Sequence, residues 1–340
     1  MTKPRRQLID IEQTPYYHCI SRCVRCAYLC GEDHVTGKNY AHRKAWALER
    51  LALLSHVFAI DVASFAILSN HMHLVLRVDQ QKAAQWDDKT VAQRWRKLYS
   101  WPPWVHKYLQ GKASKAESVQ ARAIIQTWRE RLFSISWFMR CLNEYLARRA
   151  NEEDNCTGRF WEGRYKSQAL LCEAAVLNCM AYVDLNPIRA GIADTPEHSD
   201  YTSVKQRIET LACGTNNKKE KNDRTKKSTH IKLMPLVRQK NDRHPNAMGY
   251  TLKDYLRLID WVGRNVRTDN RAAMPSNTPP ILQRLQLNAD DFLEHVLHYE
   301  DQALYPVAMG PLDKIKSFAG HLKQKFIKGQ HPQQRLFSSI

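Results

Sequence analysis

Two histidines separated by a single residue are the sharpest chemical feature of this sequence. His71 and His73 follow Asn70 at the start of a segment, residues 71–78, that is rich in strand-forming residues. Side chains alternate along a strand, so both imidazoles point to one face while Met72 points to the other. Such a pair can bind one divalent metal ion. For an isolated His-x-His, two strand histidines that only share a face are the commoner arrangement.

A tyrosine and an asparagine form a second candidate for chemistry. Tyr182 and Asn186 are four residues apart, which places them on the same face of a helix, one turn apart. A phenol can attack a phosphodiester when a metal or a base helps it to ionise. An amide oxygen is an acceptable ligand for Mg²⁺ or Mn²⁺. The structural alternative is a buried tyrosine bonded to backbone and an asparagine that ends a helix.

A group of cysteines near the N-terminus has the spacing of a metal centre. Cys19, Cys23 and Cys26 spell C-x3-C-x2-C, which can bind an iron–sulfur cluster, and Cys30 and His34 follow closely and allow a zinc site. Against a cluster, Cys19 falls inside an expected strand, and the chain has no repeated βα units. We therefore expect unrelated reduced thiols here.

The elements that position these residues follow from hydrophobic periodicity. Alternating and β-branched residues predict strands, and apolar residues at helical spacing predict helices. A helix is expected to end at Asn186 because Pro187 disfavours the α conformation of the residue before it. The expected strands cover residues 16–22, 58–68 and 71–78, with an extended segment inside 158–171, and the expected helices cover 42–58, 134–150 and 172–185.

The rest of the chain divides by composition. Residues 80–130 carry many tryptophans and basic residues and form an expected helical insertion, while helical periodicity returns at 250–267, 289–299 and 312–327. Residues 214–244 hold ten Lys and Arg against three Asp and Glu, which is typical of a flexible linker or a nucleic-acid arm. We expect a catalytic domain over 1–213, a basic linker over 214–249 and a helical extension over 250–340.

Charge and hydropathy indicate the class of binding partner and the cellular compartment. The 340 residues include 52 Lys and Arg and 34 Asp and Glu, a formal net charge of +18, which favours a polyanionic partner. The most apolar stretch, residues 51–68, is interrupted by His56 and Asp61, so no membrane span is expected. No signal peptide is visible at the N-terminus. These features predict a cytoplasmic protein.

Four segments together resemble a known family, the single-tyrosine HUH transposases of insertion sequences, and within it the REP-associated tyrosine transposase branch. No single segment is specific for this family, but the occurrence of all four in this order over residues 14–195 is strongly specific for it. The segments are Tyr17-His18-Cys19-Ile20-Ser21-Arg22, Leu68-Ser69-Asn70-His71-Met72-His73-Leu74-Val75-Leu76, Gly158-Arg159-Phe160-Trp161-Glu162-Gly163-Arg164-Tyr165-Lys166-Ser167 and Tyr182-Val183-Asp184-Leu185-Asn186-Pro187-Ile188-Arg189-Ala190-Gly191.

The resemblance implies a fold and an active site. The fold is α+β, a ferredoxin-like antiparallel sheet with helices on one face, in which the histidine strand faces the tyrosine helix. His71 and His73 match the ligands of a Mg²⁺ or Mn²⁺ ion, Tyr182 matches the nucleophile, and Asn186 matches the residue that completes the metal site, although related branches have Gln there. Tyr145 is a rival nucleophile, ranked second because it lacks the Asn-Pro context.

The resemblance also implies a reaction and a partner. Tyr182 would cleave and rejoin single-stranded or hairpin DNA through a 5′-phosphotyrosine, as a monomer or a homodimer. The alternatives are a domesticated nucleic-acid-binding regulator without catalysis and, last, a redox or metal-cluster enzyme built on the cysteines. Basic and aromatic side chains would bind the strand by phosphate contact and base stacking. The candidates for DNA contact are Arg22, Arg159, Trp161, Arg164, Tyr165, Lys166 and Arg189.

Overall fold

A five-stranded sheet lies at the centre of the computed structural model, which describes residues 8–24, 30–31, 37–215, 230–237, 247–267, 280–299, 306–325, 327 and 334–337. The strand order is β2-β3-β1-β4-β7, and only the β4–β7 pair is parallel. The α+β class expected from the sequence is confirmed. The strands are β1 (Tyr16–Arg22), β2 (Ile60–Ile67), β3 (His71–Val78), β4 (Lys166–Leu170) and β7 (Ala308–Met309).

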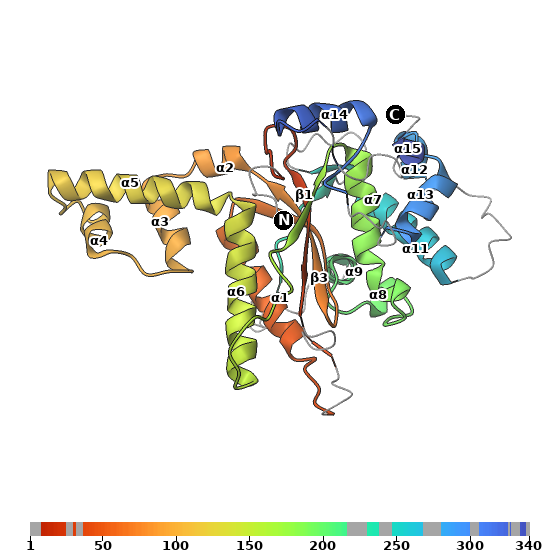
Figure 1. Cartoon of the computed structure of the whole chain (residues 1–340), viewed down its shortest axis with the longest axis horizontal. Helices are drawn as coiled ribbons and strands as arrows, with labels where there is room; N and C mark the ends of the chain where they lie inside the picture. Colours follow the sequence, from red (N-terminus) through yellow and green to blue (C-terminus); the bar gives the residue numbers. More distant parts are fainter. Residues whose placement is uncertain are drawn as a thin grey trace.

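The first four strands and two helices follow one another in the order β-α-β-β-α-β, and these strands lie side by side as β2-β3-β1-β4. Helix α1 (Arg43–Val57) connects β1 to β2, and helix α6 (Ile135–Glu153) leads into β4. The two helices contact each other, and their apolar residues share one core cluster with Tyr17, Cys19 and Leu74 of the sheet. One face of the sheet is therefore covered by α1 and α6, as Figure 1 shows.

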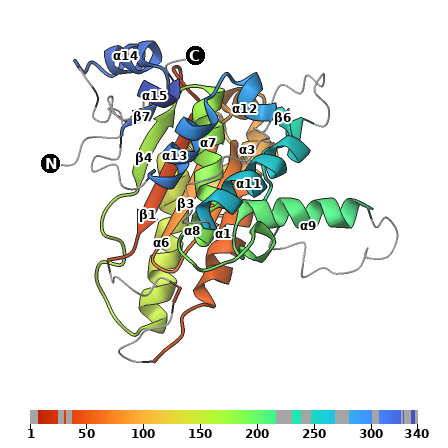
Figure 2. The ribbon, with the colours of Figure 1, turned by 90° about the vertical axis from the view of Figure 1, so that its right-hand side faces the viewer.

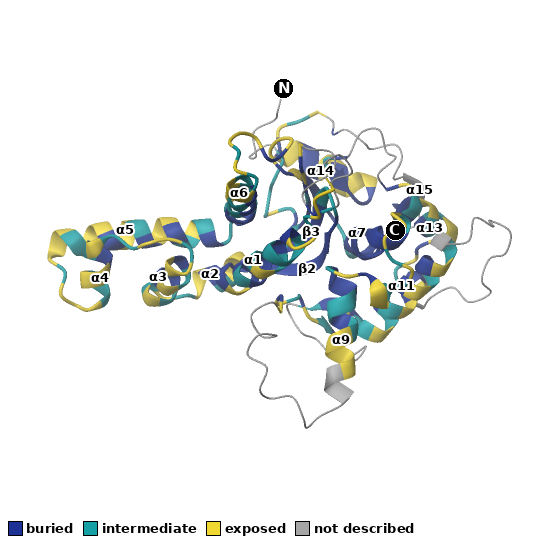
Figure 3. Cartoon of the chain, turned by 90° about the horizontal axis from the view of Figure 1, so that it is seen from below, coloured by how far each residue is buried: buried dark blue, intermediate teal, exposed yellow. Residues whose placement is uncertain are grey.

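The opposite face is covered as well, which corrects the expectation of helices on one face. Helix α7 (Glu173–Asp184) packs on β2 and β3, and α11 (Leu252–Arg267) and α13 (Ala289–Leu297) pack on α7. Figure 2 looks onto this layer. Every residue of β2 is buried, and a strand without an exposed side chain requires cover on both faces. Figure 3 shows the resulting buried strands between the helical layers.

The segment between β3 and α6 is a helical arm that projects from the sheet (Figure 1). Its longest helix begins with a capping box, in which Ser114 Oγ accepts from the Glu117 amide at 3.2 Å and Glu117 Oε2 accepts from the Ser114 amide at 2.8 Å. Near the core, Trp95 stacks on Trp128 with ring centroids 5.6 Å apart. The helices of the arm are α2 (Gln80–Ala84), α3 (Asp88–Arg96), α4 (Pro103–Leu109) and α5 (Lys115–Leu132).

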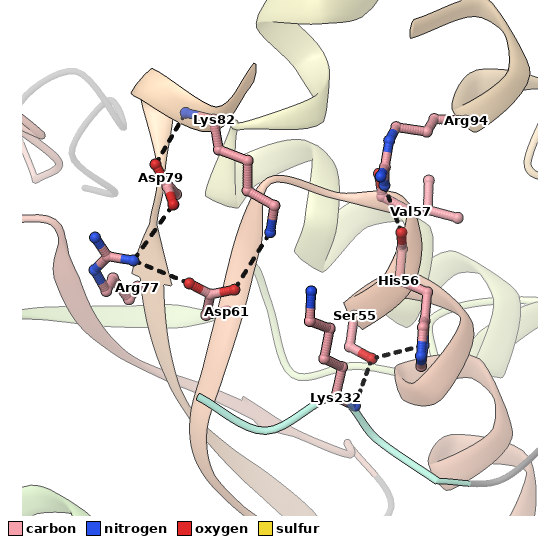
Figure 4. Close-up of polar contacts among 9 residues, drawn as sticks. All are labelled: Ser55, His56, Val57, Asp61, Arg77, Asp79, Lys82, Arg94 and Lys232. Atoms are coloured by element: carbon pink, nitrogen blue, oxygen red, sulfur yellow. Dashed lines mark hydrogen bonds and ion pairs between the residues drawn. The ribbon is translucent and has the colours of Figure 1, made fainter. Parts of the chain in front are cut away.

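The arm is fixed to the core at its base. The Arg94 guanidinium donates to the carbonyls of His56 at 2.6 Å and Val57 at 3.1 Å, so it satisfies the C-terminal end of α1 (Figure 4). Both ends of the arm also meet one residue of the core, because Ala59 N donates to Leu132 O at 2.8 Å and Ala59 O accepts from Asp79 N at 2.9 Å. These contacts fix the direction in which the arm leaves the sheet.

The C-terminal part of the chain packs directly on the core. Residues 230–237 run along β2, where Met234 N donates to Val62 O at 2.7 Å, and Lys232 N donates to Ser55 Oγ at 3.0 Å (Figure 4). Strand β7 adds to β4. Much of the expected basic linker, residues 216–229 and 238–246, lies outside the described residues. Within the described ranges, no helix has the length and apolar character needed to cross a bilayer.

Candidate active site

The two histidines of β3 share the sheet face that α7 covers. Arg22 lies opposite His71 and Ile20 lies opposite His73 in the antiparallel pairing of β1 with β3. The two imidazole centroids are 4.8 Å apart, with planes at 79°. His73 is completely buried, whereas His71, at the strand end, is half-buried. The strand therefore places two imidazoles together at the edge of a buried layer.

Helix α7 brings the candidate tyrosine to these imidazoles. The Tyr182 ring is completely buried and meets the His73 ring edge-on, at 5.4 Å between centroids. One turn later, Asn186 Nδ2 lies 3.5 Å from His73 Nε2. His73, Tyr182 and Asn186 thus converge as expected from the sequence, although their segments are far apart in the chain. Their roles as metal ligands and nucleophile remain predictions.

The local sequence explains how α7 reaches this position. Cys172 Sγ accepts from the Ala175 amide at its start, and the helix ends at Asp184 with Leu185 as its C-cap. The short helix α8 (Asn186–Arg189), with Pro187 in its first turn, follows at once. Residues 174–184 are all buried. A helix that is apolar on every side must be enclosed, and here the sheet lies on one side and α11 and α13 lie on the other.

A buried carboxylate joins the tyrosine helix to two later helices. Asp184, completely buried, accepts from the Ser203 hydroxyl, from the Val204 amide at 3.0 Å and from the Tyr255 hydroxyl at 2.5 Å. Ser203 and Val204 begin α9 (Ser203–Thr215), and Tyr255 lies on α11. Burial raises the pKa of Asp184, and it also raises the pKa of Tyr255 well above its ordinary value. This network fixes α7 relative to α9 and α11.

A third imidazole, absent from the predicted site, contacts His73. His18 Nε2 lies 3.0 Å from His73 Nδ1, and both side chains are completely buried. Burial lowers the pKa of His18 to about 3 and lowers the pKa of His73 well below its ordinary value. Both rings are therefore neutral at physiological pH. His18 lies within the Tyr17–Arg22 segment, but nothing in that segment alone assigns it a partner.

Tyr299 covers the candidate nucleophile. Its ring stacks on the Tyr182 ring at 4.1 Å and 14°, and its hydroxyl donates to Gln168 Oε1 at 2.5 Å. The Arg189 guanidinium lies 5.0 Å from the Tyr182 ring centroid and donates to Leu297 O at 2.6 Å. The residues that follow α13 therefore close over Tyr182. No motif signals this role, because Tyr299 belongs to a segment, residues 289–299, for which the sequence predicts only helical periodicity.

The donor set fits a divalent metal ion held through imidazole nitrogens. His71 Nδ1 is bonded to Asn70 Oδ1 at 2.5 Å, so its Nε2 carries the lone pair, as a metal ligand requires. Asn186 can add an amide oxygen beside His73. Among the described residues, no group of three or more His, Cys, Asp and Glu side chains is placed to hold a metal. Two imidazoles and an amide would leave positions open for water or phosphate oxygens.

Six of the seven predicted DNA-contact residues separate into two groups, and the seventh, Arg189, is half-buried and donates to Leu297 O. Arg22 and Lys166 are exposed and lie on the same sheet face as the histidines, because Lys166 pairs with Ile20 on β1. Arg159 and Arg164 are also exposed. The two aromatic residues of the same loop, Trp161 and Tyr165, are buried instead.

The hydrogen bonds of these two rings correct their expected role. Trp161 Nε1 donates to Asn143 O at 2.9 Å, and the Tyr165 hydroxyl lies 3.2 Å from Ser136 Oγ. Both rings pack in the core that contains α6. A base-stacking platform must be exposed, so these two rings hold the loop in place instead, and only its basic side chains remain candidates for DNA contact.

Tyr145, the rival nucleophile, lies on the other side of the sheet. It belongs to α6 and packs against the cluster shared with α1. Its hydroxyl accepts from Arg149 Nη1 at 2.7 Å, and Arg50 lies over its ring at 4.8 Å. The arrangement places Tyr145 among arginines and away from His71 and His73.

The cysteine spacing does not bring a metal centre together within the described residues. Cys26 and His34 lie outside those residues. Cys19, Cys23 and Cys30 are buried, and burial raises the pKa of the Cys30 thiol to about 12.

Acid is expected to lower the free energy of unfolding through His295, a residue of the helix that packs on α7. This residue of α13 is bonded at Nδ1 to Asn178 Oδ1 at 2.9 Å, and burial lowers its pKa to about 4. The unfolded chain takes up a proton on this imidazole below pH 6.5, whereas the folded chain does not until pH 4. Its contribution to stability is therefore complete above pH 6.5 and decreases as pH falls, by roughly 2 kcal/mol at pH 5.

The variant His295→Gln keeps a hydrogen-bonding group for Asn178 but does not titrate. Between pH 7 and pH 5, its free energy of unfolding in urea should fall by roughly 2 kcal/mol less than that of the unmodified chain. Equal pH dependence in the two proteins would contradict the assignment of a neutral buried imidazole.

Comparison with known proteins gives one structural likeness. No protein-family model matches the chain, and neither does any curated protein. Among solved structures, a REP-associated tyrosine transposase bound to a REP hairpin is similar, with 9% sequence identity and a TM-score of 0.37 over 66% of this chain and 96% of that chain. At that TM-score the likeness carries no argument, and the candidate site rests on its own geometry.

Proposed function

We propose that the chain is a metal-dependent enzyme that cleaves and rejoins single-stranded, hairpin-bearing DNA through a tyrosine–phosphate intermediate. One observation carries the proposal: Tyr182 lies against His73, with ring centroids 5.4 Å apart, while Asn186 reaches the same imidazole at 3.5 Å. A phenol, paired imidazoles and an amide in one place supply a nucleophile and a site for a cation. The net charge of +18 supports a polyanionic substrate.

His71, His73 and Asn186 would hold Mg²⁺ or Mn²⁺. When bound, such an ion polarises the scissile phosphate and neutralises charge that develops on its oxygens. Tyr182 Oη forms a bond to phosphorus, and the bond from phosphorus to the 3′ oxygen breaks. The phenolic proton passes to water, and the leaving 3′ oxygen takes up a proton. The products are a 5′-phosphotyrosine and a free 3′-OH, and attack by a second 3′-OH reverses the step and joins strands.

Exposed basic residues beside this centre would bind the strand. Arg22 and Lys166 lie on the histidine face, toward the open end of β1. Arg159 and Arg164 belong to the adjacent loop. Their guanidinium and ammonium groups can contact phosphates without reading sequence. Tyr182, however, is completely buried beneath Tyr299, so Tyr299, which follows α13, must move before a phosphate can reach the phenol.

A second candidate function follows from that closure. A nucleic-acid-binding regulator would keep the positive charge and the fold. It would not need access to the Tyr182 hydroxyl, so the burial of this residue is compatible with that function. The two functions differ in one measurable product, a covalent protein–DNA adduct. They share salt-sensitive binding, because binding depends on phosphate contacts in both.

Metal removal tests the proposal directly. Incubation with hairpin-bearing single-stranded DNA and Mn²⁺ or Mg²⁺ is expected to give an adduct that persists on a denaturing gel, and EDTA should abolish it. Because the protein is joined to a 5′ phosphate, a label at the 3′ end should travel with the protein, whereas a label at the 5′ end should appear on a released strand. Tight binding without an adduct in either metal would favour the regulator.

A further inference from the structure

A buried chain of polar side chains crosses the sheet beneath the two histidines. His18, on β1, and Gln168, on β4, are opposite each other in the β1–β4 pairing. His18 lies on the same face as His73, because His73 pairs with Ile20, two residues along β1. All three side chains are completely buried. In this layer each polar group must find its partner within the protein.

The hydrogen bonds of these side chains converge on the Gln168 amide, which accepts from both sides. The Tyr299 hydroxyl donates to Gln168 Oε1 at 2.5 Å, and His18 is hydrogen-bonded to the same side chain. Among the described residues Gln168 Nε2 has no hydrogen-bond partner, so the oxygen of this amide is the atom bonded to His18. An amide oxygen only accepts, so His18 donates its N–H to it and offers the lone pair of Nε2 to His73 Nδ1, 3.0 Å away. His73 then carries its proton on Nδ1. Its Nε2 bears a lone pair on the side where Asn186 Nδ2 lies, at 3.5 Å.

We propose that His18 is a positioning residue that holds His73 in the tautomer able to bind a metal ion through Nε2. The inference rests on the proposed function, because it assigns His18 a role toward the same site. A neutral imidazole has one lone pair, and the group bonded to its other nitrogen decides which nitrogen carries it. At His71 that group is Asn70, at 2.5 Å from Nδ1. His18 supplies the equivalent contact for His73, from another strand and completely buried.

Two substitutions separate the hydrogen bond from the space that the ring fills. His18→Leu removes the acceptor at Nε2. His18→Gln can place an amide oxygen near the same position and restore it. His295→Gln is the matched control, because His295 is also a buried imidazole of this layer but is bonded to Asn178 rather than to His73.

The first measurement is a titration of the full chain with Mn²⁺ in the absence of DNA, in which electron paramagnetic resonance reports the bound metal. His18→Leu is expected to weaken binding about 10- to 100-fold, His18→Gln to recover most of the loss, and His295→Gln to leave binding unchanged. Equal affinity in His18→Leu and the unmodified chain would overturn the inference while leaving the proposed function intact.

The second measurement needs neither metal nor catalysis. Ring ¹⁵N chemical shifts of the metal-free, unmodified chain, with the histidines labelled, should show His73 protonated at Nδ1 and not at Nε2. A proton on Nε2 would overturn the inference, whether or not any variant folds. If the ring is protonated at Nδ1 but the unmodified chain binds no Mn²⁺, the proposed metal-dependent function fails, and so does the purpose assigned to His18.

Discussion

Replacing Tyr182 with phenylalanine is expected to abolish the covalent DNA adduct, a loss of at least about three orders of magnitude in the rate of its formation. The substitution removes only the nucleophilic oxygen. The phenylalanine ring can keep the stacking on Tyr299 at 4.1 Å and the edge contact with His73 at 5.4 Å. Stability and DNA affinity should therefore change little, and quantification of adduct on a denaturing gel isolates the chemical step.

Tyr145→Phe and Tyr299→Phe are the matched controls. Tyr145 lies on α6, on the opposite side of the sheet, so loss of its hydroxyl should leave adduct formation unchanged. Tyr299 is close to the site, but its hydroxyl is committed to Gln168, and we expect its variant to retain the adduct. An adduct that survives in Tyr182→Phe and disappears in one of the other two would place the nucleophile elsewhere.

Loss of the Asp184 carboxylate is expected to be the most destabilising single change near the site. Asp184→Ala would leave the Ser203 hydroxyl, the Val204 amide and the Tyr255 hydroxyl without their buried acceptor. A cavity would form at the end of α7 as well. Breaking a buried polar network of this kind costs about 3–5 kcal/mol. Unfolding in urea, followed by circular dichroism, should show this decrease.

Comparison of Asp184→Ala with Asp184→Asn separates the loss of the hydrogen bonds from the loss of side-chain volume. Asp184→Asn keeps the shape and one acceptor, so we expect a loss of about 1–2 kcal/mol. Glu209→Ala, on the exposed side of α9, should change the free energy of unfolding by less than about 0.5 kcal/mol. If Asp184→Ala were as mild as Glu209→Ala, the carboxylate would not be joining α7 to α9 and α11.

Much of the central sheet was predictable because its strands are locally consistent. The strands expected over residues 16–22 and 71–78 have those bounds in the structure, and the strand expected over 58–68 is β2, Ile60–Ile67. The helix expected over 42–58 is α1, Arg43–Val57. Strand β7 was not predicted, since two residues, Ala308 and Met309, carry no periodicity. Its pairing with β4 is a tertiary contact that no local pattern specifies.

The candidate site was predictable only for residues with a motif. Histidine spacing placed His71 and His73 on one face, and helical spacing placed Asn186 one turn after Tyr182. The partners His18, Gln168 and Tyr299 were not foreseen, because their contacts depend on the pairing of three strands and on the position of α13. Trp161 and Tyr165 were misjudged for a similar reason: composition does not say whether an aromatic ring faces solvent or core.

The base of the helical arm has a consequence for how this chain could be shortened or extended. Asp79 and Leu132, at the two ends of the arm, both hydrogen-bond to the backbone of Ala59. A tight turn could therefore bridge the gap with little entropic cost of closing the loop, and β3 would still feed α6 without any change in strand order. Removal of the arm is thus compatible with the surrounding topology. The segment between Asp79 and Leu132 could be deleted, or replaced by another, without a change in the order of the strands.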